Sequence, residues 1–150
     1  MISRILAPVD FSDCSDRALT YAVEMTDKFQ AELILLYVVP EISTLVPDAV
    51  MAVPTVGPDM DEVMKAANES LVKLVATKQL TRLNPRLESR IGSPAHTIIQ
   101  TATDDKIDLI VLGTHGRSGL SHFFLGSVAE KVVRGAPCPV LTVRSTGEES

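Results

Sequence analysis

Four short apolar runs, which do not alternate with polar residues, are the feature that most restricts the fold of this chain. They cover residues 5–9, 33–39, 109–112 and 140–143. Strands that are apolar at successive positions are covered on both faces, as in parallel sheets with helices on either side. A more polar run at 86–91 alternates in character, which is typical of an edge strand.

Stripes of apolar residues at helical spacing lie between these runs. The four stripes fall within residues 18–29, 60–75, 95–102 and 128–133. The order βαβαβαβαβ predicts an α/β fold, a doubly wound open five-stranded parallel sheet with strand order 3-2-1-4-5 and helices on both faces. We expect one domain over residues 1–150, because a chain of this length encloses a single core.

Capping signals support these helices. Ser12 precedes the first helix, and Ser93-Pro94 supplies a cap and a first-turn proline for the third. Ser127 and Glu130 form a capping-box pattern for the fourth helix, and Gly135 is placed to end it.

Composition limits the class of partner and the location. The formal net charge of −5 disfavours binding to nucleic acid. No apolar run approaches the roughly 18 residues of a membrane span, and no signal-peptide pattern opens the chain. We therefore expect a cytoplasmic protein without membrane insertion, in which Cys14 and Cys138 are reduced thiols.

Two segments look incomplete in a monomer. The segment 40–58 has no clear periodicity but carries several apolar residues, and long loops of this kind are often functional. The last strand is apolar and would lie at a sheet edge, which favours pairing with a second chain. We expect a homodimer through Val140, Leu141, Thr142 and Val143. The alternative is that Pro137, Pro139 and Arg144 protect this edge.

A ligand site is expected where the chain order reverses, beyond the carboxyl ends of the first and fourth strands. Asp10 follows the first strand, and the fourth leads through a glycine-rich loop to a helix beginning near Gly126-Ser127. Glycines let the backbone approach phosphate oxygens, and a helix N-terminus favours an anion. His115 and Arg117 can add positive charge. Asp10 can accept hydrogen bonds from a ribose hydroxyl or an adenine amino group.

Each of these residues also has a purely structural interpretation. The glycines can be turn residues, Ser127 a helix cap and Asp10 part of a turn. The histidines, without a metal-binding spacing, are typical of surface or packing positions. The convergence of these residues on one predicted crevice favours the ligand site.

The segment Gly113-Thr114-His115-Gly116, then nine intervening residues, then Gly126-Ser127, resembles the G-x2-G-x9-G-(S/T) motif of the ATP-binding branch of the universal stress protein family. The resemblance extends to residues 5–12, 91–95 and 137–141, and so covers nearly the whole chain.

The resemblance implies a five-stranded parallel sheet and a dimer formed through the last strand. It places an adenine nucleotide (ATP, ADP or AMP) across Pro8, Val9 and Asp10, with Val38 and Leu112 lining the adenine. The phosphates would meet Gly113, Gly116, Gly126, Ser127 and Val128, and a divalent ion such as Mg²⁺ or Mn²⁺ would be held through them. His115 and Arg117 are not fixed parts of the motif.

The function expected on this basis is that of an adenine-nucleotide-binding regulatory protein of the stress response. Its nucleotide state would modulate the dimer or the contact with a protein partner of unknown identity. One alternative is a slow ATP hydrolase, although no Walker-type motif and no clearly placed catalytic base are evident. Another is a scaffold for protein contacts that does not bind nucleotide.

Overall fold

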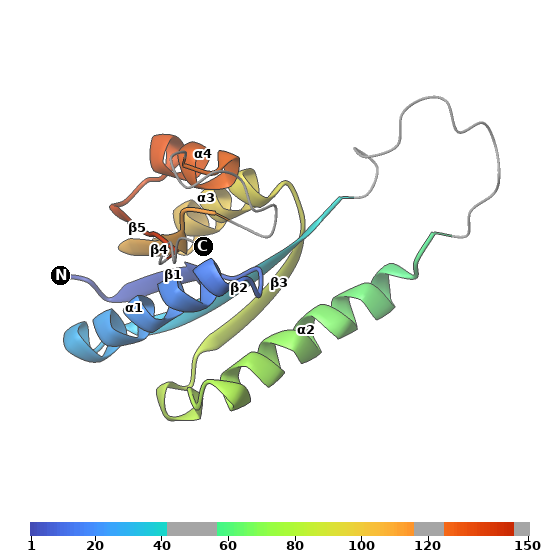
Figure 1. The fold of residues 1–150 in the computed structure, drawn as a ribbon, viewed down its shortest axis with the longest axis horizontal. Coiled ribbons are helices and arrows are strands. Elements are labelled where there is room, and N and C mark those ends of the chain that lie inside the picture. The colour runs from blue at the N-terminus through green and yellow to red at the C-terminus, as the bar shows by residue number, and fades with distance from the viewer. Residues whose placement is uncertain (42–56, 116–124, 146–150) are drawn as a thin grey trace, which may run out of the picture.

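A single parallel sheet of five strands forms the centre of the molecule. The computed structural model describes residues 1–41, 57–115 and 125–145 of the chain. The strand order is β3-β2-β1-β4-β5, as predicted. All neighbouring strands are parallel, and the sheet is covered by helices on both faces (Figure 1). The strands and helices alternate along the chain. They follow in the order β1 Arg4–Pro8, α1 Asp13–Phe29, β2 Glu32–Pro40, α2 Met60–Thr77, β3 Arg86–Gly92, α3 Pro94–Asp104, β4 Leu109–Gly113, α4 Ser127–Gly135 and β5 Val140–Val143, with a short 3₁₀ turn at Thr81–Leu83.

Two apolar layers hold the helices to the sheet. Because side chains alternate across a strand, Ile5 and Ala7 of β1 face α1 and α2, whereas Leu6 faces α3 and α4. Strands β1, β2 and β4 contribute most of the large, fully buried side chains of both layers, which explains why their sequences are apolar at successive positions. Full burial of one leucine or isoleucine side chain contributes about 1.5–3 kcal/mol.

The predicted starts of α1 and α4 are confirmed, but the predicted cap of α4 is wrong. The Ser12 hydroxyl accepts a hydrogen bond from the Ser15 N–H and caps α1. At α4 the N-cap is Gly126, not Ser127, and no side chain caps the helix. The expected role of Gly135 also differs. It is the last helical residue, and a Cβ there would lie 2.7 Å from Cδ1 of Ile99. Close packing against α3 therefore explains this glycine.

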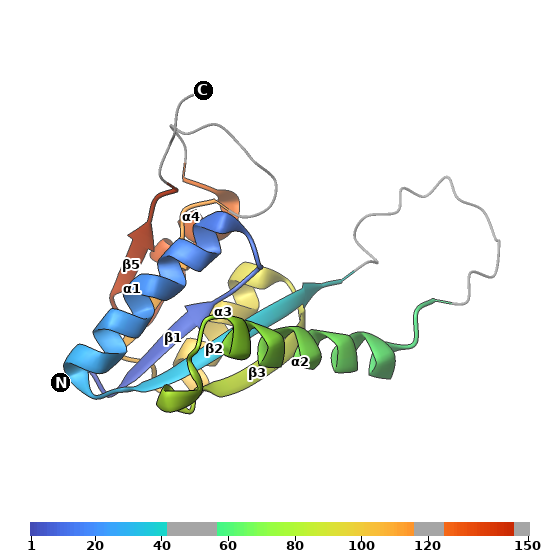
Figure 2. The ribbon, with the colours of Figure 1, turned by 60° about the horizontal axis from the view of Figure 1, so that its bottom comes forward.

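Helix α2 is fixed to the rest of the molecule mainly at its C-terminal end. Lys78 Nζ lies 2.8 Å from Asp16 Oδ2 of α1, and Arg82 makes a bidentate pair with Asp27 at 2.7 Å. Its apolar stripe is buried at Ala67, Leu71 and Leu74, but the residues nearer its start are not buried. The N-terminal half of α2 extends beyond the sheet, as the second view shows (Figure 2).

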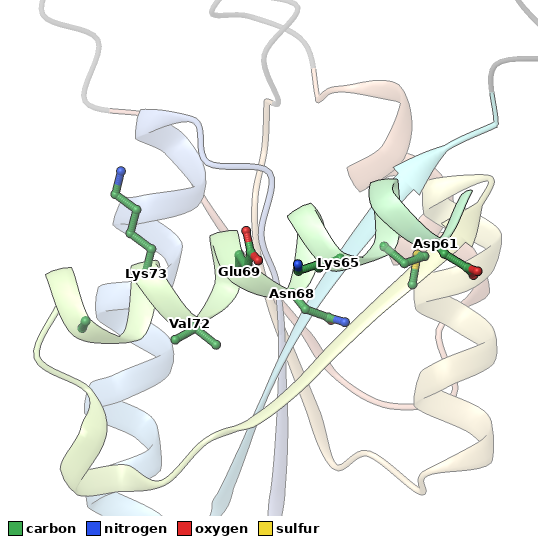
Figure 3. A pocket seen from close by; sticks show the side chains of 8 residues that line it. Asp61, Lys65, Asn68, Glu69, Val72 and Lys73 are labelled. Carbon is green, nitrogen blue, oxygen red and sulfur yellow. The ribbon is translucent and has the colours of Figure 1, made fainter. Parts of the chain in front are cut away.

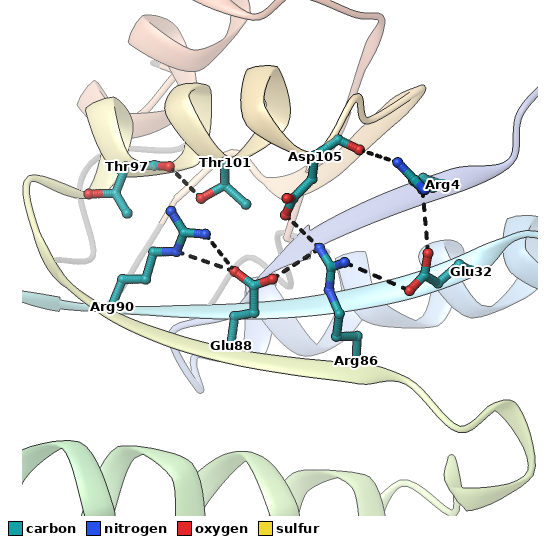
Figure 4. A network of polar contacts seen from close by, with 8 residues as sticks. All are labelled: Arg4, Glu32, Arg86, Glu88, Arg90, Thr97, Thr101 and Asp105. Carbon is teal, nitrogen blue, oxygen red and sulfur yellow. Dashed lines mark hydrogen bonds and ion pairs between the residues drawn. The ribbon is translucent and has the colours of Figure 1, made fainter.

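The edge strand β3 carries a network of charged side chains on the face toward α3 (Figure 4). Arg86 contacts Glu88 at 3.0 Å and also pairs with Asp105 at the end of α3. Arg90 pairs with Glu88 at 2.9 Å. Charges on an edge strand disfavour pairing with another strand, so β3 is protected in a way that β5 is not.

Among the described residues, no helix has the length and apolar character needed to cross a membrane. The two cysteines are free thiols. Burial raises the pKa of the Cys138 thiol, which favours its protonated form.

Candidate nucleotide-binding site

A cavity of about 410 Å³ lies at the carboxyl ends of β1 and β4. These strands are neighbours in the sheet, but β1 leads into α1 on one face and β4 leads toward α4 on the other. The two connections diverge there and leave a crevice between them, as expected for a doubly wound sheet. The cavity is therefore a direct consequence of the strand order.

The polar wall of the cavity begins at Asp10, directly after β1. Asp10 Oδ1 accepts hydrogen bonds from the Ser12 N–H at 3.0 Å and from the Ser12 hydroxyl. The Asp10 N–H donates to Ser15 Oγ at 3.2 Å, and Ser15 is buried. These contacts fix the carboxylate at the cavity wall, so it offers a preorganised acceptor to a ligand hydroxyl or amino group.

The residue after Asp10 is held in an unusual backbone conformation. Phe11 has φ of 64°, in the left-handed region that a bulky side chain rarely adopts. Its ring packs edge-on against Tyr37 of β2, with 4.9 Å between ring centroids. Strain of about 1–3 kcal/mol is typical of such a residue and persists only where packing supports it. The Phe11–Tyr37 contact provides that support, and Tyr37 itself lines the cavity.

The deep wall of the cavity is apolar. It is formed by Leu36 and Val38 of β2, Leu112 of β4 and Ile98 of α3, all of which are buried. The Val9 N–H donates to the Leu36 carbonyl oxygen at 2.8 Å and continues the β1–β2 ladder to the cavity rim. An apolar slot beside a fixed carboxylate suits a flat heterocycle that carries hydrogen-bonding groups on its edge.

The N-terminus of α4 forms the opposite wall. The first N–H groups of an α-helix have no partner within the helix, and among the described residues no side chain caps them here. They belong to Ser127, Val128 and Ala129, which all line the cavity. The free N–H groups and the positive end of the helix dipole make this wall suited to an anion.

Gly113 and Gly126 are required by close packing, which the sequence alone did not reveal. A Cβ on Gly113 would lie 2.8 Å from Cys14 Sγ and 3.1 Å from the Cys14 backbone. A Cβ on Gly126 would lie 2.6 Å from the Thr114 carbonyl oxygen, which accepts a hydrogen bond from the Gly126 N–H at 2.7 Å. These glycines allow α1 and α4 to approach the end of β4 and so determine how wide the cavity is.

Most of the residues predicted from the sequence line this one cavity: Pro8, Val9, Asp10, Val38, Leu112, Gly113, His115, Gly126, Ser127 and Val128. Gly116 and Arg117 lie outside the described residues, as does most of the 40–58 segment. His115 Nδ1 lies 2.9 Å from the hydroxyl oxygen of the buried Thr114.

Further lining residues were not predicted: Ser15, Leu36, Tyr37, Pro40, Pro94, Ile98, Thr114 and Ala129. The carboxyl end of β2 and the start of α3 at Pro94 were recognisable in the sequence. That both reach the same crevice follows from the three-dimensional arrangement.

Within the ranges that the structure describes, no group of three or more histidine, cysteine, aspartate or glutamate side chains could hold a metal ion. The described cavity combines an apolar slot, a fixed carboxylate and the first backbone N–H groups of α4.

Comparison with known proteins agrees with this fold. The model of the universal stress protein family matches residues 1–144. This match spans nearly the whole chain, and the chain belongs to the universal stress protein family.

Similar proteins come from archaea and bacteria. Universal stress protein MJ0531 of Methanocaldococcus jannaschii is 35% identical, over 99% of this chain and 86% of that protein. The structure of universal stress protein UspA from Lactobacillus plantarum is 33% identical, with a TM-score of 0.70, and covers 95% of this chain and 97% of that one.

Two more distant proteins of the same fold were solved with nucleotides. One is a universal stress protein in complex with cAMP, 20% identical with a TM-score of 0.64, covering 94% of this chain and 96% of that one. The other, from Archaeoglobus fulgidus, is in complex with dAMP, 20% identical with a TM-score of 0.59, covering 95% and 98%.

Proposed function

We propose that this protein binds an adenine nucleotide, ATP or its products ADP and AMP, in the cavity between β1 and β4. The observation that carries the proposal is the uncapped N-terminus of α4, which faces an apolar slot across the same cavity. A nucleotide has an apolar ring at one end and anionic phosphates at the other, so it matches both walls at once.

The base occupies the apolar slot, where Val38 and Leu112 contact its faces. The ribose lies beside the Asp10 carboxylate, which accepts a hydrogen bond from a hydroxyl. The phosphates reach Gly113, Gly126, Ser127 and Val128, with His115 beside them. Gly116 and Arg117 belong to the proposed site through the sequence motif alone. The cAMP and dAMP complexes support this choice, because both contain an adenine nucleotide on the same fold.

A divalent cation, Mg²⁺ or Mn²⁺, would be held through the phosphate oxygens. The described residues that line the cavity include one carboxylate, Asp10, and it lies toward the proposed ribose. The cation would therefore neutralise phosphate charge without a protein cage of its own.

We also propose that the nucleotide state regulates a homodimer formed through β5, and through it a contact with a protein partner. The edge strand is apolar, and Val140, Leu141 and Thr142 are only half-buried. The Thr114 N–H donates to the Val143 carbonyl oxygen at 2.9 Å, and the Thr114 carbonyl accepts from Gly126. Thr114 thus connects the proposed phosphate wall to the proposed dimer edge. We propose that the protein acts in this way in the cytoplasm, as part of the stress response.

The test begins with the purified protein. Denaturation should release an adenine nucleotide, identified by chromatography. In the nucleotide-free protein, ATP at 100 times its dissociation constant should add about 2.7 kcal/mol to the free energy of unfolding. That corresponds to a rise in Tm of roughly 5–10 °C for a chain of this size.

Adenosine and inorganic triphosphate test the contributions of the two cavity walls to binding one at a time. Each alone should bind more weakly than ATP, because each fills only one part of the cavity. If calorimetry detects no binding of ATP, ADP or AMP to the nucleotide-free protein, the proposed nucleotide site is wrong. The alternative of a scaffold for protein contacts is then favoured.

A further inference from the structure

The outer face of α2 carries a second hollow, which shares no described lining residue with the cavity between β1 and β4 (Figure 3). A shallow groove of about 600 Å³ runs along it. Its described lining comes entirely from α2: Asp61, Met64, Lys65, Asn68, Glu69, Val72, Lys73 and Ala76. Val72 is 59% exposed, and Met60, which directly precedes the first lining residue, is 46% exposed. A helix face that leaves large apolar side chains in water is suited to a partner.

Charges on this face alternate in sign along one row of the helix. Asp61, Lys65, Glu69 and Lys73 follow one another at intervals of four residues, and all four are exposed. Within the described part of the chain, none of the four takes part in an ion pair, although other charged residues near α2 do. The row therefore keeps its full pattern of charge available to a partner.

This pattern is complementary to itself when reversed. Asp61 and Lys73 are equally far from the midpoint of the row, and so are Lys65 and Glu69. A second α2 that runs in the opposite direction therefore places a lysine opposite each acid and an acid opposite each lysine. A parallel arrangement in the same register places like charges together.

Helix packing geometry brings these rows into contact. Residues four apart form a ridge on an α-helix, and the commonest packing of two helices sets such ridges parallel to one another, at a crossing angle of about −50°. The adjacent row of Met64, Asn68, Val72 and Ala76 then lies at the contact as well and supplies its apolar surface.

We propose that the outer face of α2 is a self-association surface, where two copies of this chain pair their α2 helices in antiparallel orientation. A two-fold axis makes each contact occur twice, as in most symmetric dimers. The surface is separate from β5, because α2 packs against the β2–β3 side of the sheet and β5 lies at the opposite edge. It does not depend on nucleotide binding.

Charge reversal tests the pairing, measured by sedimentation equilibrium. Lys73→Glu sets the new carboxylate against Asp61 of the second copy, and Asp61→Lys sets two lysines together. Each variant alone should lose the α2 contact, with association weakened about tenfold or more. An equimolar mixture of the two should associate as the wild type does, because each row is then complementary to the other.

Two variants serve as matched controls. Lys131→Glu on α4 and Glu24→Lys on α1 change the net charge by the same amounts at exposed helix positions, and both should associate normally. A disulfide assay separates this surface from β5: Asn68→Cys, in a Cys138→Ser background, should form crosslinked dimers because residue 68 lies near the proposed two-fold axis.

Several results would overturn the proposal. The first is that both single charge variants associate as strongly as the wild type. The second is that their mixture associates no better than either variant alone. The third is that the Asn68→Cys protein forms no crosslinked dimer. Association through β5 alone would give these results while nucleotide binding persisted, so the two proposals fail independently.

Discussion

Gly126 shows how one missing side chain shapes the site. Its φ of −60° and ψ of 156° are open to any residue, so the need for glycine is steric rather than conformational. The Thr114 carbonyl oxygen occupies the space where a Cβ would lie, and it is a backbone atom that cannot rotate away.

We expect Gly126→Ala to push the start of α4 away from β4. The cost should be about 1–3 kcal/mol of stability, as for other overpacked positions, together with weaker nucleotide binding. Gly57→Ala is the matched control, because a Cβ there meets nothing within 4 Å. Urea unfolding and ATP titration of both variants check this. Equal behaviour of the two variants would contradict the steric role of Gly126.

Asp108 ties the beginning of β1 to the turn before β4. Its Oδ2 accepts hydrogen bonds from the Ser3 N–H at 2.8 Å and the Arg4 N–H at 3.0 Å. These two donors hold the pKa of Asp108 below its ordinary value. A carboxyl whose pKa is lower in the folded state stabilises the fold above its unfolded pKa, and this stability is lost as the pH falls through the folded pKa.

Asp108→Asn should therefore destabilise the protein at pH 7 by about 1 kcal/mol, a modest value because the site is near the surface. The difference from the wild type should shrink as the pH falls below about 3.9, where the carboxyl of the unfolded protein begins to be protonated, and it should be lost once the pH has fallen through the lower pKa of the folded state. Denaturant unfolding at pH 7 and pH 3 measures it. Asp104→Asn, at an exposed residue of α3, is the control that removes the same charge elsewhere.

At the scale of the elements, the outer edge of β5 can be tested as the proposed dimer contact. The Pro139 and Val143 carbonyls accept hydrogen bonds from β4 residues and their neighbours, Ile110 and Thr114. Successive residues of a strand point their backbone groups to opposite sides, so the N–H and C=O groups of Val140 and Thr142 point outward. Those groups are available to a strand of a second copy.

Thr142→Pro should remove an outward donor without breaking the β4 ladder. We expect it to abolish association through β5 and lower the mass seen by light scattering, whereas Thr142→Val, which keeps the N–H, should not. If the proline variant keeps the wild-type mass, including in an Asp61→Lys background, the proposed β5 dimer is wrong.

The elements were largely predictable from the sequence, because burial on both faces leaves a local signature. The apolar runs placed β1, β2, β4 and β5, and Ser12 marked the start of α1. Ser127 was misassigned as a cap because a capping-box pattern is short, whereas the actual N-cap, Gly126, is determined by contact with Thr114. In α2 the apolar stripe predicted a continuous buried face, but its N-terminal part extends beyond the sheet.

The site was predictable to the extent that it depends on strand ends. Asp10 and the glycines follow strands in the sequence, so topology alone brings them together. Tyr37 and Ser15 could not be assigned in the same way. Tyr37 enters the site through its contact with the strained Phe11, and Ser15 through its hydrogen bond to the Asp10 backbone. Both depend on distances that no spacing in the sequence encodes.

At the scale of the whole molecule, the two proposed association surfaces lie at opposite edges of the sheet. Helix α2 lies beside β2 and β3, and β5 closes the other side (Figures 1 and 2). Two separate self-complementary surfaces on one protein join four copies into a closed assembly if their axes are compatible, and otherwise generate an open chain.

The carbonyl oxygen of Val143 accepts hydrogen bonds from both Thr114 and the buried Cys14 thiol, the latter at 3.3 Å. Strand β5 is thereby bonded to the loop that precedes α4 and to the first turn of α1. Thermodynamic linkage makes any influence along this route mutual. If ATP tightens the subunit contact by a given factor, assembly must tighten ATP binding by that same factor, and dilution of the protein would itself promote release of its nucleotide.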